Sequence, residues 1–126
     1  MKFPENLKYS EDHEWLKIDG NIATIGITEF AQGELGDVVF VELPEVDDEF
    51  DAGEAFGTIE AVKTVSDMML PIAGKIVEVN NLLEDEPEMI NSDSFGKGWI
   101  VKVEISDEKE LENLMDSKAY KEFVGE

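Results

Sequence analysis

Short runs of apolar and β-branched residues, separated by turn residues, follow one another along most of this chain. Residues 14–26 contain two such runs around Asp19-Gly20, a dipeptide typical of tight β-hairpin turns. Further runs cover residues 38–43, 55–60, 65–70, 75–79 and 99–105. Apolar residues alternate in the last run, which predicts a strand with one face formed by Trp99, Val101, Val103 and Ile105. Many short strands with turns between them predict a sandwich or a barrel.

Two helices are predicted to interrupt the strands. Residues 28–36 form a short one, with Thr28 as its N-cap and Gly36 just past its end. Ser106 is predicted to cap a C-terminal helix, with an apolar stripe at helical spacing formed by Leu111, Leu114, Met115, Ala119 and Phe123. Residues 84–91, which are polar and surround Pro87, are predicted to form a loop. We therefore expect a mostly β fold of short strands, with a short helix in its N-terminal half and a C-terminal helix. No linker or low-complexity segment divides residues 1–126, which indicates a single domain.

The chain is strongly acidic and contains no arginine. Its 126 residues carry a net charge of −21, and its ten Lys and Arg residues are all lysines. Nucleic-acid binding requires a basic face, so this composition argues against a nucleic-acid partner. No apolar run is long enough for a membrane span, so we expect no membrane partner. No signal peptide is recognisable, so we expect a bacterial cytoplasmic protein, or a mitochondrial one only if a transit peptide was removed.

The chemistry available to the chain's own side chains is limited. The chain has no cysteine and a single histidine, His13, which we interpret as structural. A thiolate nucleophile and a His-pair zinc site are therefore excluded, and with His13 interpreted as structural we expect no Ser-His-Asp triad. Asp47, Asp48 and Asp51 share one loop but lack the glycine and terminal glutamate of a calcium-binding loop. We expect no catalytic residue and no metal, so that redox chemistry requires an attached group.

Lys63 stands between two predicted strands, with Val62 and Thr64 as its neighbours. This pattern predicts a lysine at the tip of a tight hairpin, where it would be exposed and rigidly held. Such a position suits the attachment of a swinging cofactor. For an isolated lysine, an ordinary solvated turn would be the default interpretation, because most charged residues simply lie at the surface.

Several separated motifs change that interpretation. They are Tyr9–Trp15 with its His-Glu-Trp, residues 26–32 and 35–44, residues 60–67 around Lys63 with 71–74 and 77–80, and Asn91 with Gly98-Trp99. In this order and spacing, the chain resembles the glycine cleavage H-protein family from about Leu7 to Phe123. It departs from the family's usual pattern in having Ala61-Val-Lys-Thr64 in place of Ser-Val-Lys-Ala, and Ser94-Phe95 in place of Pro-Tyr.

The resemblance implies a lipoyl-type barrel-sandwich of antiparallel strands, with lipoic acid covalently attached to Lys63. It implies a carrier that is not itself an enzyme. The carrier would take the aminomethyl group of glycine from glycine decarboxylase (P protein) to the aminomethyltransferase (T protein), and the dihydrolipoyl arm to dihydrolipoyl dehydrogenase (L protein). A lipoate-attaching enzyme is the further implied partner.

Glu14 and Asp67 align with acidic residues that line a cleft for the loaded arm in this family. A carboxylate there would hold the cationic end of the arm through a charge-assisted hydrogen bond. The alternative is that both are ordinary acids of a strand and a turn.

Related carriers and functions remain as alternatives. Biotin carriers have methionine on both sides of the lysine, whereas Val62 and Thr64 occupy these positions here. Lipoyl domains of 2-oxoacid dehydrogenases usually have Asp before the lysine and lack the terminal helix. A relay that donates lipoyl groups to other carriers, and an unmodified H-like interaction module, stay open.

Overall fold

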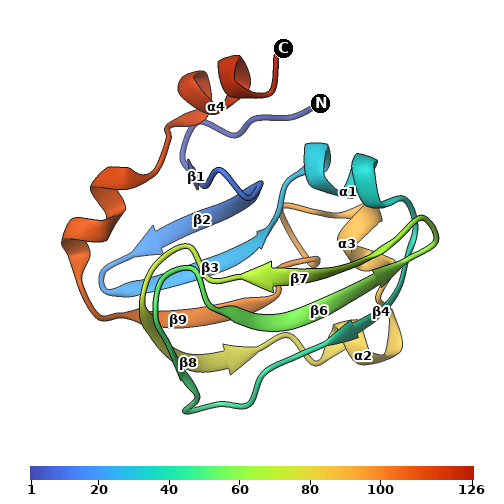
Figure 1. Cartoon of the computed structure of the whole chain (residues 1–126), viewed down its shortest axis with the longest axis horizontal. Coiled ribbons are helices and arrows are strands. Elements are labelled where there is room, and N and C mark those ends of the chain that lie inside the picture. The colour runs from blue at the N-terminus through green and yellow to red at the C-terminus, as the bar shows by residue number, and fades with distance from the viewer.

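The computed structural model describes all residues 1–126 and contains two sheets whose strand pairs are all antiparallel. The larger sheet has the order β1-β2-β3-β9-β8-β5, formed by β1 (Lys8–Tyr9), β2 (Glu14–Asp19), β3 (Ile22–Ile27), β9 (Val101–Ile105), β8 (Gly74–Val79) and β5 (Glu49–Phe50). The smaller has the order β4-β6-β7, formed by β4 (Val38–Glu42), β6 (Ala55–Ala61) and β7 (Val65–Met69). Figure 1 shows the smaller sheet lying across the larger one.

Both sheets contribute to one apolar core, which confirms the predicted barrel-sandwich of mostly β structure. Leu16 and Ile25 from the larger sheet pack in the same buried cluster as Ile59 and Met68 from the smaller one. Alternation along β9 buries Val101, Val103 and Ile105, as predicted. Trp99 was wrongly placed on this face: it precedes the strand and packs against a second cluster formed by Leu7, Tyr9, Trp15 and Tyr120.

The first hairpin and the first helix are confirmed. Asp19 pairs with Ile22, which leaves Gly20 and Asn21 in the turn, and Gly20 has a φ of 63°. Helix α1 covers Glu29–Leu35, and the Thr28 hydroxyl accepts a hydrogen bond from the Ala31 amide at 3.2 Å. Such a side-chain cap satisfies a donor that the helix itself leaves free.

The loop predicted for residues 84–91 is wrong. Two short helices, α2 (Leu82–Asp85) and α3 (Met89–Ser92), lie there. Each places one fully buried side chain, Leu83 or Ile90, in the main core. One apolar anchor per turn is enough to fix a short helix, although the surrounding sequence is polar.

The single C-terminal helix is also a wrong prediction. The segment forms a 3₁₀ helix, η1 (Glu108–Asn113), and then α4 (Ser117–Phe123), with Asp107 and Asp116 as their N-caps instead of Ser106. Between them, Met115 and Tyr9 exchange two backbone hydrogen bonds of 2.8 Å, which a continuous helix would break. The predicted stripe also fails, because Ala119 and Phe123 are exposed and Tyr120 is buried, stacked on the Tyr9 ring at 4.6 Å. No helix in the structure has both the length and the apolar character needed to cross a bilayer.

Candidate functional site

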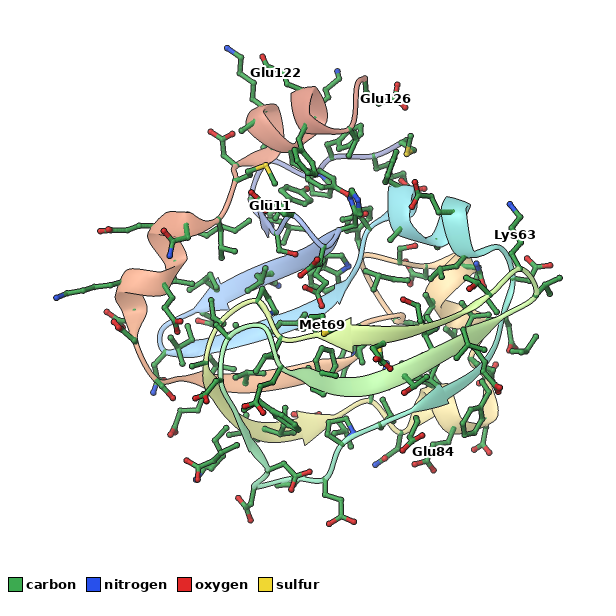
Figure 2. All side chains as sticks on the ribbon, viewed as in Figure 1. Glu11, Lys63, Met69, Glu84, Glu122 and Glu126 are labelled. Atoms are coloured by element: carbon green, nitrogen blue, oxygen red, sulfur yellow. The ribbon has the colours of Figure 1, made fainter.

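Lys63 lies at the tip of the β6–β7 hairpin, as predicted. The tip is tight, since the Ala61 amide donates to the Thr64 carbonyl at 2.9 Å. Lys63 and both neighbouring residues are exposed. Figure 2 shows the Lys63 side chain at the far end of the hairpin, beside the end of α1.

The tip is held against residues 35–37, which we call the α1 platform. The Val62 amide donates to the Asp37 carbonyl at 2.9 Å, and the Lys63 amide makes a longer bond of 3.4 Å to the Leu35 carbonyl. The stem of Lys63 lies over Gly36, where a Cβ would come within 3.3 Å of the lysine Cγ. Gly36 also has a φ of 82°, a conformation that favours glycine. The local sequence therefore holds the Lys63 side chain closely against residues 35–37.

Asn91 on α3 fixes this platform from the other side. Its Oδ1 accepts a hydrogen bond from the Val38 amide at 2.8 Å. Its Nδ2 donates to Gln32 Oε1 at 2.9 Å and to the Gly36 carbonyl at 3.0 Å. Sequence reasoning named Asn91 only as part of a motif and assigned it no role, since its partners lie more than fifty positions away.

A cleft of about 420 Å³ opens beside the platform and brings Glu14 and Asp67 together. Glu34 and Leu35 at the end of α1 line the cleft. Lys63 Nζ lies 3.4 Å from the carbonyl oxygen of Gly33 in the same helix, so the edge of the cleft is close to Lys63. The lining is apolar and acidic, and its other residues are Glu11, Asp12, His13, Ile27, Ala31, Ile59, Ser66, Met68 and Met69. Glu11 and Met69 can be located in Figure 2.

Glu14 and Asp67 differ sharply in environment. Glu14 is buried, and its Oε1 accepts a hydrogen bond from the Ser10 hydroxyl at 3.0 Å. Burial raises the pKa of Glu14 well above its ordinary value; the Ser10 hydrogen bond opposes this and the nearby Asp12 charge adds to it. Asp67 is exposed on β7. The cleft therefore offers one shielded and one solvated carboxyl group.

His13 lines the cleft but serves the structure around it, in line with its predicted structural role. Its Nδ1 lies 3.0 Å from the Tyr120 hydroxyl, which lies 2.7 Å from the Thr28 hydroxyl. This chain connects α4 to the N-cap of α1. His13 itself has a φ of 67°, so the loop before β2 is tightly constrained.

Comparisons with known proteins identify the family of this chain. Residues 7–126 match the sequence profile of the family described as glycine cleavage H-protein. Curated proteins named glycine cleavage system H protein from Staphylococcus haemolyticus and Staphylococcus saprophyticus are each 58% identical over 126 residues, covering 100% of both chains. The crystal structure of a glycine cleavage system H protein from Mycobacterium marinum superposes with a TM-score of 0.88 at 39% identity, covering 98% of this chain and 99% of that one. The chain therefore belongs to the glycine cleavage H-protein family, the lipoyl carriers of the glycine cleavage system.

Proposed function

We propose that Lys63 carries a lipoyl group in amide linkage and that the protein shuttles the aminomethyl group of glycine between the enzymes of the glycine cleavage system. The observation that carries this proposal is an exposed lysine on a rigid hairpin tip, seated beside an apolar and acidic cleft. Its amine is exposed and makes one long hydrogen bond of 3.4 Å, to the Gly33 carbonyl, so it is accessible for attack on an activated lipoyl carboxyl group. In that step the new carbon–nitrogen bond replaces the bond to the activating group, which leaves, and the nitrogen releases its proton to water.

The surroundings of Lys63 fit a lipoyl arm. When attached, the dithiolane supplies a two-electron disulfide–dithiol couple. The chain has no cysteine that could form a mixed disulfide with it. Apolar residues of the cleft, including Leu35, Ile59 and Met69, suit the carbon chain of the arm.

Within the cleft, Glu14 and Asp67 are proposed to hold the cationic end of the loaded arm. A carboxylate makes a charge-assisted hydrogen bond to an amine, about twice as strong as a neutral one. Burial raises the pKa of Glu14, and a docked cation would lower this pKa again because an opposite charge nearby favours the charged form of the carboxyl group. Enclosure by Ile59 and Met68 would limit access of water to the labile group.

We further propose that residues 1–126 act as one lipoyl-carrier domain without catalytic residues of its own. The partners are glycine decarboxylase, the aminomethyltransferase, dihydrolipoyl dehydrogenase and a lipoate-attaching enzyme. The relatives are bacterial, which supports a bacterial cytoplasmic location.

Replacement of one lysine tests the carrier proposal. Lys63→Arg keeps the charge but removes the amine that forms the amide, so we expect no lipoylation and background glycine oxidation with the purified partner enzymes. Lys121→Arg, at an exposed position on α4, is the matched control and should behave as wild type. Circular dichroism should show both variants folded. Glycine oxidation by folded Lys63→Arg protein would refute the proposal.

A further inference from the structure

Exposed apolar side chains gather around Lys63. Val39, Phe40, Val62 and Val65, which we call the tip patch, are four of the seven large hydrophobic residues that the whole molecule exposes. Val62 and Val65 belong to the hairpin that carries Lys63, and Val39 and Phe40 lie on β4, which pairs with β6. Single exposed apolar residues are ordinary, whereas a group of them marks an interaction surface.

The strand register places part of this patch on one continuous face. Phe40 pairs with Glu60, and Glu60 pairs with Val65, so these three side chains lie in a row across the sheet. The next row, Val41 and Ile59, is buried in the core. Alternation therefore turns the row of Phe40, Glu60 and Val65 outward, on the face opposite the core.

Charge around the patch has one sign except at the lysine. Asp37, Glu42 and Glu60 are exposed beside the apolar side chains. Within residues 37–42 and 60–67, Lys63 is the only basic residue. The surface thus fits a partner with an apolar centre, a rim of Lys or Arg, and an opening for one amine.

We propose that the tip patch is the docking surface for the enzyme that attaches lipoate to Lys63. This inference rests on the proposed lipoylation of Lys63. The attaching enzyme must bring its reactive carbon to bonding distance of Lys63 Nζ before any arm exists, so it has to cover the residues around the tip. Enzymes that use the finished arm meet its far end and have no such requirement.

The test measures lipoylation of the unmodified protein by a purified ATP-dependent lipoate ligase with free lipoate. Phe40→Ser is compared with Phe123→Ser, because both phenylalanines are 51% exposed and only Phe40 belongs to the tip patch. Aromatic residues at the centre of an interface commonly dominate binding, so Phe40→Ser should raise KM about tenfold with kcat nearly unchanged. Phe123→Ser should match wild type.

A second variant separates docking from folding. Val62→Ser changes a side chain that is 72% exposed in the loop and should also raise KM without lowering the thermal midpoint. Once lipoylated, Phe40→Ser protein should be oxidised by dihydrolipoyl dehydrogenase as fast as wild type.

Three outcomes would overturn the inference: equal KM values for Phe40→Ser and Phe123→Ser, an unchanged KM for Val62→Ser, or an equal loss for the lipoylated Phe40→Ser protein with the dehydrogenase. If the ligase does not modify the wild-type protein at all, the proposed function fails, which distinguishes the two failures.

Discussion

At the residue scale, Glu14 shows how position in the fold changes an ordinary side chain. Its carboxyl group is buried in the cleft wall and has only the Ser10 hydroxyl as a side-chain hydrogen-bond partner. Burial of a carboxyl group disfavours its charged form, which raises the pKa of Glu14 above its ordinary value. Glu14 can therefore destabilise the protein when the cleft is empty and stabilise it when a cation is bound in the cleft.

Glu14→Gln should make the empty protein more stable at pH 7. The stability that Glu14 contributes is complete below its unfolded-state pKa of about 4.3, and it is lost as pH rises through the raised folded-state pKa. Each unit by which the folded value exceeds the unfolded one costs about 1.4 kcal/mol at high pH. Glutamine keeps an oxygen acceptor for Ser10 and cannot ionise. Urea denaturation at several pH values should show an advantage for the variant that shrinks on acidification toward pH 4. An advantage that grows on acidification would contradict the account.

The site residues differed in how far the sequence could identify them. Lys63, Glu14 and Asp67 were named from motifs, and the structure places Glu14 and Asp67 in one cleft next to Lys63. The burial of Glu14 and the three hydrogen bonds of Asn91 were not predictable. Both depend on which distant segments meet, and no local pattern encodes that.

At the element scale, the tip of the β6–β7 hairpin is held by its contacts with the end of α1 as well as by the pairing of its own strands. The Val62 amide bonds to Asp37, and Gly36 contacts the stem of Lys63. Asn91 in turn ties Gly36 and Val38 to α3. Loss of Asn91 should therefore loosen the hairpin tip, even though the hydrogen bonds of Asn91 go to Gln32, Gly36 and Val38 and not to the tip itself.

Asn91→Ala, compared with Asn80→Ala, tests this connection. Asn80 is a matched control because its Nδ2 also donates two hydrogen bonds, to the backbone carbonyls of Lys97 and Trp99, each at 2.7 Å. Each change leaves partly buried polar groups unpaired and should cost about 1 kcal/mol or more in the free energy of unfolding. Only Asn91→Ala should speed hydrogen exchange of the Val62 amide, by about tenfold. Equal exchange of this amide in both variants would show that Asn91 does not position the tip.

Strands with a clear period and helices with a clear cap were predictable, as β9 and α1 show. The C-terminal segment was not, because its apolar residues fit helical spacing while the chain turns at Met115 to pair with Tyr9. A backbone pairing across more than a hundred residues leaves no local trace. The N-cap at Asp116 was a usable signal that the helical spacing obscured.

At the scale of the whole molecule, charge is the dominant surface property. The chain has 31 acidic residues against ten basic ones, and a single ion pair, Lys102–Glu78 at 3.7 Å. Most of the negative charge therefore faces solvent unpaired. A surface of this kind attracts basic partners over long distances and speeds their association.

Association with glycine decarboxylase should weaken steeply with added salt. Screening shortens the Debye length from about 30 Å at 0.01 M to about 10 Å at 0.1 M, so most long-range attraction is lost over that range. Stopped-flow measurements should show the association rate constant falling and the dissociation rate constant changing little. An association rate constant independent of salt would remove steering from the account.

The central claim is that Lys63 is the carrier lysine, and the mass of the modified protein tests it most directly. The protein is produced in cells supplied with lipoate, and its intact mass and peptide map are recorded by mass spectrometry. We predict one lipoyl increment per chain, located on the peptide that contains Lys63 and absent from Lys63→Arg protein. An unmodified chain, a biotin increment, or a lipoyl group on any other lysine would contradict the account.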